Sequence, residues 1–252
     1  MAITIKNTDE INIMKEGGKI LYGIVEDIKS KARVGISTYQ LDQRAFDLCK
    51  ENKVKPAFLH YRGYPATLCV GVNDVVVHGI PSKDEILADG DIISIDMGII
   101  YKEFYTDMAV TVGVGAINKK AERLINCTKE CLQAAILKSK GGSTIGDIGY
   151  EIQSIAELSG FNVVRQMVGH GIGRNLHEDP QIPGFGNLKE GIKLSEGMTL
   201  AIEAIINEGD CSIKFLEDGW TTKTIDGSLS ALFEHTVVVK EDAAEILTID
   251  KN

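Results

Sequence analysis

The sequence is poor in cysteine and has no long apolar run. Its five cysteines are Cys49, Cys69, Cys127, Cys131 and Cys211. Their odd number and the lack of a Cys-x-x-Cys pair indicate neither a disulfide framework nor a thiolate zinc site. No apolar stretch approaches the roughly 18 to 20 residues that span a bilayer, and the amino terminus lacks the long apolar run of a signal peptide. These absences predict a cytoplasmic protein with reduced cysteines and no membrane partner.

Clustered positive charge is also missing. The chain has 27 Lys and Arg against 36 Asp and Glu, a formal charge of −9, and no run of basic residues. A duplex-binding surface needs grouped cations to displace counterions. DNA is therefore excluded as an expected partner. With 252 residues that are 44% apolar, the chain can instead form one large globular domain.

The two halves of the sequence repeat each other. Apolar residues at three- and four-residue steps predict an amphipathic helix over 9–29, and a second helix follows the Ser37 to Gln40 capping-box spacing. The same order returns later, with a helix beginning near Ala121 and another capped at Ser143-Thr144. We therefore expect two related halves, at about 9–115 and 116–247, within a single domain spanning 1–252.

The expected strands repeat as well. Each half contains a His-Gly pair, at His78 and His170, and then a carboxylate within an apolar run that starts at Leu87 in one half and Leu194 in the other. A second carboxylate lies near the end of a further strand. Two such α-α-β-β units related by a pseudo-twofold axis would bring their polar groups together. The expected fold class is α+β, with a curved antiparallel sheet covered by helices on its outer face.

Four acids in these apolar strands need a cationic partner. They are Asp96, Asp107, Glu203 and Glu234. Burying them unpaired would cost several kcal/mol each, and no Lys or Arg lies in 92–100 or 199–207. Two divalent cations would balance their charge, and oxygen ligands with one imidazole suit Mn²⁺, Fe²⁺ or Co²⁺, with Zn²⁺ remaining an option.

Histidines lie beside the same motifs. The glycines around His170 disfavour a helix and allow close approach to a ligand, so His170 is assigned to the metal and His177 to the substrate. His235 follows Glu234 directly and would point to the opposite face of a strand, where a structural role is expected.

At these residues the sequence resembles the type I methionine aminopeptidases, which have the pita-bread fold, over about residues 7–247. The motifs that carry the resemblance are Asn73-Asp-Val-Val-Val-His78-Gly-Ile-Pro81, Gly90-Asp-Ile-Ile-Ser-Ile-Asp96, Gly169-His170-Gly-Ile-Gly173, His177-Glu-Asp-Pro180, Glu196-Gly-Met, Asp218-Gly-Trp220 and Ser228-Leu-Ser-Ala.

The resemblance implies a metallo-exopeptidase that removes the amino-terminal methionine of nascent polypeptides, preferring a small second residue. The family's five metal ligands match Asp96, Asp107, His170, Glu203 and Glu234. Glu203, His177 and His78 match its catalytic groups. Its substrate-binding positions match His78, His177, Tyr61, Tyr64, Cys69 and Trp220. A monovalent-cation site would match Asn73, Val75 and Ser230. A monomer and transient association with the ribosome are further expectations.

Two alternatives stay open on the sequence alone. One is a related pita-bread aminopeptidase of different specificity, such as an aminopeptidase P or a prolidase. The other is a non-catalytic pita-bread protein that only binds. The chain also departs from the family pattern at Phe58, Arg62 and Leu176, which bears on the methionine pocket and not on the metal site.

Overall fold

A computed structural model describes residues 3–250; residues 1–2 and 251–252, which belong to the expected domain, lie outside the described part. The helices are α1 (Thr8–Lys31), α2 (Thr38–Glu51), α3 (Lys119–Lys138) and α4 (Ile145–Leu158), with a short 3₁₀ turn, η1 (Tyr61–Gly63). The strands are β1 (Lys55–Pro56), β2 (Cys69–Val72), β3 (Val75–Val77), β4 (Ile92–Tyr101), β5 (Phe104–Gly113), β6 (Asn162–Val163), β7 (Gly169–Gly171), β8 (Glu178–Ile182), β9 (Thr199–Asn207), β10 (Ile213–Phe215), β11 (Thr222–Thr224), β12 (Ser230–Val238) and β13 (Glu245–Ile246).

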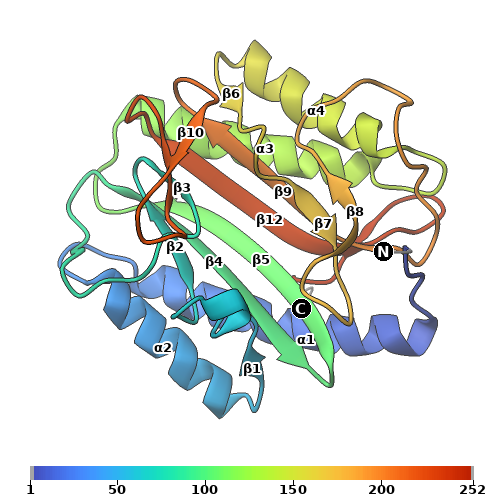
Figure 1. Ribbon diagram of the computed structural model, residues 1–252, viewed down its shortest axis with the longest axis horizontal. Coiled ribbons are helices and arrows are strands. Elements are labelled where there is room, and N and C mark those ends of the chain that lie inside the picture. The colour runs from blue at the N-terminus through green and yellow to red at the C-terminus, as the bar shows by residue number, and fades with distance from the viewer. Residues whose placement is uncertain (1–2, 251–252) are drawn as a thin grey trace.

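The main sheet is a curved antiparallel layer in the order β1-β4-β5-β12-β9-β7-β8, with a smaller sheet β10-β11-β3 at one end (Figure 1). The long central strands β5 and β12 join the two halves of the chain. Helix α1 packs on β4 and β5, whereas α3 packs on β9 and β12. Each half of the sheet therefore has its own pair of helices, as the repeat in the sequence predicts.

Strand register shows that all of these helices cover one face. Met97 pairs with Met108, which pairs with His235, which pairs with Ile202. These side chains form one row across the sheet, and Met97 packs in the core beneath α1 while Ile202 packs beneath α3. The alternation of a strand leaves every neighbouring residue on the opposite, helix-free face.

Helix α1 follows its predicted stripe, since Met14, Leu21, Val25 and Ile28 are all buried. Among residues 3–250, no helix combines the length and apolarity needed to cross a membrane.

The helix starts match the expected capping signals. Ser37 accepts a hydrogen bond from the Gln40 N–H and the Gln40 side chain accepts one from the Ser37 N–H, which is a complete capping box. Thr144 and Asp147 form the same arrangement at α4. Because both boxes satisfy backbone groups at a helix start, they fix where the second helix of each half begins.

The segments before these helices also match. Gly35 and Gly142 have φ of 87° and 88°, a conformation that glycine adopts without a Cβ clash. The Gly35 N–H donates to the Leu87 carbonyl at 2.8 Å, and the Gly142 N–H donates to the Leu194 carbonyl at 3.0 Å. Each half thus has the same long-range hydrogen bond before its second helix.

Two strands begin later than predicted. The apolar runs from Leu87 and Leu194 were expected to be extended throughout, but β4 starts at Ile92 and β9 at Thr199. The intervening Gly90 and Gly197 have φ of 96° and 85°, so each run makes a turn before its strand.

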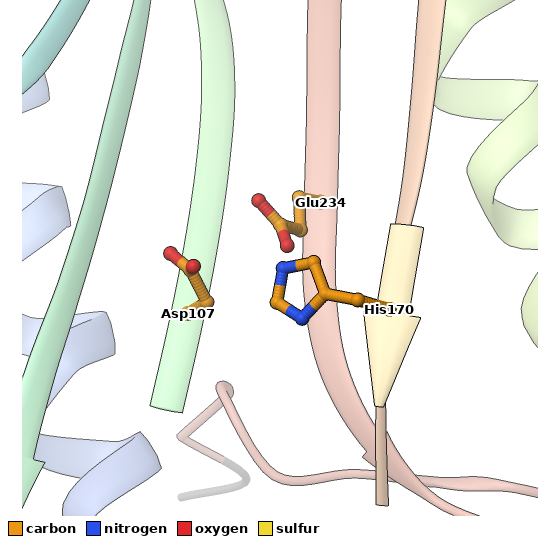
Figure 2. Close-up of side chains that lie close together, drawn as sticks. All are labelled: Asp107, His170 and Glu234. Carbon is orange, nitrogen blue, oxygen red and sulfur yellow. The ribbon is translucent and has the colours of Figure 1, made fainter. Parts of the chain in front are cut away.

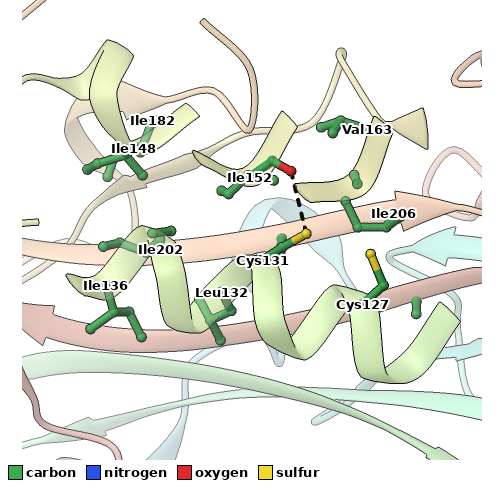
Figure 3. Close-up of a cluster of buried hydrophobic side chains, with 14 of the residues drawn as sticks. Cys127, Cys131, Leu132, Ile136, Ile148, Ile152, Val163, Ile182, Ile202 and Ile206 are labelled. Atoms are coloured by element: carbon green, nitrogen blue, oxygen red, sulfur yellow. Dashed lines mark hydrogen bonds between the residues drawn. The ribbon is translucent and has the colours of Figure 1, made fainter. Parts of the chain in front are cut away.

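The core of the second half lies between α3, α4 and β9 (Figure 3). Cys127 and Cys131 face it from α3, and the Cys131 Sγ donates to the Ile152 carbonyl at 3.4 Å. All five cysteines are free, and four of them are buried. The expectation of mostly buried cysteines is confirmed.

Candidate metal centre and substrate cavity

The helix-free face of the sheet carries a row of acids. Asp96 on β4 pairs with Ala109 on β5, Ala109 pairs with Glu234 on β12, and Glu234 pairs with Glu203 on β9. Side chains in one register row point to the same face. Three of the four predicted acids therefore lie in one line across both halves of the molecule.

The other two predicted ligands belong to the next row on that face. Asp107 is two residues before Ala109 on β5, and His170 on β7 pairs with Ala201, two residues before Glu203. The Asp107 N–H donates to the Thr236 Oγ1 at 2.8 Å, and that hydroxyl donates back to the Asp107 carbonyl at 2.8 Å. This reciprocal bond ties β5 to β12 beside the acids.

Asp107, His170 and Glu234 form a compact donor group. They extend from three different strands into one space, as Figure 2 shows, and one ligand atom from each lies within 4.8 Å of the others. All three are buried. Two carboxylates and one imidazole at this spacing are a donor set for a divalent transition metal.

The tautomer of His170 favours metal binding. Its Nδ1 lies 2.9 Å from the Gly171 carbonyl oxygen. Because a carbonyl only accepts, the Nδ1 carries the proton and the Nε2 keeps its lone pair. Metal-binding histidines are oriented by this kind of backbone hydrogen bond.

The acids carry more negative charge than this site can hold without a cation. Burial, with the neighbouring charges of Asp107 and Glu203, raises the pKa of Asp96 and of Glu234 well above the usual range. Burial raises the pKa of Asp107 to about 7, and burial with the charge of Asp107 raises the pKa of Glu203 to about 8. The buried Asp96 Oδ1 has no hydrogen-bond partner within the described residues. An oxygen without a partner beside three further acids fits a cation ligand.

A cavity of about 500 Å³ opens over these groups. It is lined by all five predicted metal ligands and by every predicted catalytic and substrate-binding residue: Tyr61, Tyr64, Cys69, His78, Asp96, Asp107, His170, His177, Glu203, Trp220 and Glu234. This volume is typical of a pocket for a small ligand or a few residues of a peptide. The structure therefore brings the whole predicted set together.

One wall of the cavity is apolar. The Tyr64 ring meets the Trp220 ring edge to face, with centroids 5.1 Å apart, and the Tyr64 hydroxyl donates to the Leu68 and Gly79 carbonyls, both at 2.8 Å. Phe58 and Leu176, which depart from the family pattern, are both buried in this wall. An apolar slot of aromatic and aliphatic groups suits a flexible thioether side chain.

Two histidines stand beside the predicted ligands. The His177 ring lies 4.4 Å from the His170 ring, and the His177 Nδ1 lies 2.8 Å from the Tyr61 hydroxyl. His78 meets the Trp220 ring edge to face at 6.2 Å. Burial and the charge of His177 lower the pKa of His78 to about 4, so it is neutral at pH 7. By contrast, His235 points to the helix-covered face, where its Nδ1 lies 2.9 Å from the Thr248 hydroxyl.

The ion pair between Lys6 and Glu178, beside the cavity, was not predicted from the sequence. Lys6 is buried, and its Nζ lies 2.5 Å from the Glu178 Oε2. Glu178 follows His177, lines the cavity and also accepts hydrogen bonds from the Thr4 hydroxyl and the Asn175 N–H. No local pattern marks Lys6, because its partner lies 172 residues away. The cavity-lining residues Gln166 and Gln181 were missed too, although both lie next to motifs that were noted.

Comparisons with known proteins identify the family of this chain. Residues 12–241 match the family model described as metallopeptidase family M24. The chain belongs to metallopeptidase family M24. Membership and the carboxylate and histidine donor group together support divalent metal binding.

Within this family, the similarity is to methionine aminopeptidases. The chain is 46% identical over 249 residues to the methionine aminopeptidase of Clostridium perfringens, covering 99% of this chain and 100% of the relative. The crystal structure of the methionine aminopeptidase from Thermotoga maritima superposes with a TM-score of 0.97 at 43% identity, covering 99% and 100% of the two chains.

The prolidase from Pyrococcus horikoshii shares the fold alone, with a TM-score of 0.79 at 22% identity over 98% of this chain and 64% of that one. The predicted α+β pita-bread fold is confirmed, and the predicted metallo-exopeptidase class is confirmed by the family and its full-length relatives.

Proposed function

We propose that this chain removes the amino-terminal methionine from peptides by metal-dependent hydrolysis, with Glu203, His177 and His78 as its catalytic groups. Full-length identity of 46% to a methionine aminopeptidase supports the activity, and the two alternatives, an Xaa-Pro specificity and a non-catalytic scaffold, are not favoured. The observation that carries the assignment of groups is the single cavity that holds the five predicted ligands beside an apolar wall.

The five ligands are Asp96, Asp107, His170, Glu203 and Glu234, and we propose that they hold two divalent ions, Co²⁺, Mn²⁺, Fe²⁺ or Zn²⁺. When bound, two such ions lower the pKa of a water and polarise a carbonyl. The number of ions follows from charge, because four carboxylates balance two divalent cations. The carbonyl oxygen of a peptide and its neutral amino group both carry lone pairs that such a centre would attract.

The chain's own groups complete the reaction. Glu203 lines the cavity in the acid row, where its carboxylate can take a proton from water and donate it to the leaving amine. If Tyr61 donates to the His177 Nδ1, the His177 Nε2 carries a proton and can donate to the oxygen of the tetrahedral intermediate. His78 lines the same cavity and can position the peptide.

The methionine side chain is assigned to the apolar wall formed by Tyr61, Tyr64, Cys69 and Trp220. Tyr64 and Cys69 are buried there, so they offer an apolar surface that excludes water from the substrate. We also propose a preference for a small second residue. The reason is that the imidazoles of His78 and His177 line the cavity beside the acids and limit the space there.

A monovalent cation is proposed near Asn73, Val75 and Ser230. The Ser230 N–H donates to the Asn73 carbonyl at 2.9 Å, while the buried Ser230 Oγ has no hydrogen-bond partner within the described residues. The Asn207 Oδ1, in the residue that pairs with Ser230, is also buried without a partner there. Unpaired neutral oxygens suit a monovalent ion.

Substrates of this activity are peptides with an amino-terminal methionine. A cytoplasmic location, transient association with the ribosome and a monomeric state are proposed on the resemblance. So is a single catalytic domain over 1–252, which the shared core and the matching halves support.

Chelation and substrate choice together test the proposed function. Treatment with EDTA should abolish cleavage of a Met-Ala-Ser peptide, and added Mn²⁺ or Co²⁺ should restore it, with metal analysis giving two ions per chain. Cleavage that survives complete metal removal would contradict the metal site. Faster cleavage of an Ala-Pro peptide than of Met-Ala-Ser would contradict the methionine pocket, and a slow Met-Leu peptide is expected from the preference for a small second residue.

A further inference from the structure

Arg62 lies at the mouth of the cavity. It is neither a proposed metal ligand nor a proposed catalytic or substrate-binding residue. It lines the cavity, its side chain is exposed, and its backbone has φ of 49° and ψ of 28° within η1. Its guanidinium carbon lies 5.4 Å from the centroid of the Tyr61 ring, a distance at which a cation and an aromatic face attract. The guanidinium is therefore held at the rim beside the ring that contacts His177.

Among the residues that the structure describes, this guanidinium has no anionic partner. Within residues 3–250, no carboxylate lies at ion-pair distance from Arg62, whereas Arg44 pairs with Asp27 and Arg174 pairs with Glu10. Arg62 is also the only Lys or Arg among the residues that line the cavity in the described part of the chain. The neighbouring acid Glu178 is already paired with Lys6. An arginine fork without a partner can bind a carboxylate in two places at once.

The direction of the peptide places its later residues at this rim. The amino group of the substrate belongs with the proposed metal ligands at the buried end, so the rest of the polypeptide must leave through the open side. The exposed residues that line the cavity are Arg62, Gln166, His177 and Gln181. Of these four residues, Arg62 is the one that carries a permanent positive charge. With the four acids balanced by the proposed metal ions, the guanidinium at the mouth is complementary to a carboxylate in the later part of the peptide.

We propose that Arg62 is a specificity-determining residue that favours substrates carrying a carboxylate beyond their second residue. This inference rests on the proposed function, because it needs the amino terminus to bind among the acids. The carboxylate can come from an acidic side chain at the third residue, or from the carboxyl terminus of a tripeptide. Both sources present the same planar anion to the guanidinium.

Two matched pairs of peptides separate these sources. The first pair is Met-Ala-Asp-Ser amide against Met-Ala-Lys-Ser amide, and the second is Met-Ala-Ser with a free carboxyl terminus against its amide. With the metal-loaded enzyme at low salt, kcat/KM should be about fivefold higher for the acidic member of a pair, the size of effect that an exposed charge pair produces. The ratio should fall towards one at 1 M salt, where screening acts within about 3 Å.

The decisive variant is Arg62→Gln, which keeps a polar side chain of similar reach without the charge. It should remove the preference in each pair that shows one. Arg33→Gln is the matched control, because Arg33 is exposed, lies outside the cavity and changes the net charge equally. This control should retain the preference.

Unchanged ratios in Arg62→Gln would overturn the proposal while leaving the proposed function intact. An equal loss of preference in Arg33→Gln would also overturn it, since net charge alone would then explain the effect. Failure of the loaded wild-type enzyme to cleave any of the four peptides would instead overturn the proposed function, and the inference with it.

Discussion

The two halves of the molecule share a scaffold and differ in what they add to it. In the first half, β4 and β5 are joined directly by Lys102 and Glu103, which have φ of 45° and 69°. In the second half, β9 and β12 are separated by residues 208–229, which form β10, β11 and the segment that carries Trp220. The matching strands β4, β5, β9 and β12 carry four of the five proposed metal ligands, and the added connection supplies part of the cavity wall. Duplication therefore explains the four acids of the proposed metal site, whereas the substrate pocket depends on where the halves differ.

The largest expected effect comes from removing one ligand from each half. Asp107→Asn in the first half and Glu203→Gln in the second should each lower kcat/KM for Met-Ala-Ser by at least about 100-fold. The reason is that even the outer partners of metal ligands commonly contribute 10- to 100-fold. Steady-state kinetics with metal-loaded protein would measure this, and circular dichroism would check the fold.

Glu26→Gln is the control for both variants, since this acid lies on α1, outside the cavity, and pairs with Lys29. Its turnover should match the wild type. If either ligand variant kept activity within tenfold of the wild type, its half would not contribute to the centre as assigned.

A second test asks which half of the molecule holds the amino-terminal segment that contains Lys6. Although Lys6 precedes the first half, its N–H donates to the Gly197 carbonyl at 2.9 Å and its Nζ pairs with Glu178, so it is held by the second half. Lys6→Met should lower the free energy of unfolding by about 3 to 5 kcal/mol, because it leaves a buried carboxylate without its partner. Urea unfolding of the metal-loaded protein would measure the loss.

The comparison variant is Lys102→Met, which removes an exposed pair with Glu16 and should cost less than about 1 kcal/mol. The double variant Lys6→Met with Glu178→Leu should recover part of the loss. Equal effects of Lys6→Met and Lys102→Met would show that the buried pair does not join the segment to the second half.

A third test uses pH on the metal-free protein. Asp107 and Glu203 have pKa values raised to about 7 and about 8, so the folded state keeps protons that the unfolded state has lost. Their stabilising contribution is present at low pH and is lost as pH rises through the folded values. Between pH 6.5 and 8.5 the free energy of unfolding should therefore fall, by up to about 1.4 kcal/mol per group and pH unit.

The window starts at pH 6.5 because the lowered pKa values of His78 and His170, both about 4, act in the opposite direction below it. Thermal unfolding after EDTA treatment would measure the slope, and Mn²⁺ should remove it. Asp107→Asn should reduce the slope in the metal-free protein. A free energy of unfolding that rises between pH 6.5 and 8.5 would contradict the raised pKa values of Asp107 and Glu203.

The smallest expected effect compares the two capping boxes. Ser37→Ala and Thr144→Ala should each cost about 1 kcal/mol, because each removes the acceptor for an N–H at a helix start. Similar losses in urea unfolding would support equivalence of the halves. A loss of stability confined to one variant would show that the two caps contribute differently to the free energy of unfolding.

The sequence was sufficient to predict the elements that depend on local chemistry. Ser37 and Thr144 cap helices because the side-chain oxygen of each accepts a hydrogen bond from the backbone N–H three residues later. Such a helix start can be predicted from this short stretch of sequence. The acids were identifiable for a related reason: a carboxylate such as Asp96 between isoleucines is costly unless something balances it. The strand starts at Leu87 and Leu194 were predicted too early, because apolar residues before a glycine turn look the same as apolar residues in a strand.

What the sequence determined by itself was the pattern: a repeated unit, its caps, and the identity of the charged groups in apolar surroundings. Only the tertiary structure decided that Asp107, His170 and Glu234 come within 4.8 Å, that Lys6 is buried against Glu178, and that Arg62 stands at the mouth without a carboxylate partner in the described part of the chain. The physical reason is range. Caps and alternation are set by contacts a few residues apart. The pairing of β5 with β12 and the ion pair between Lys6 and Glu178 join positions more than a hundred residues apart, where no local pattern carries the information.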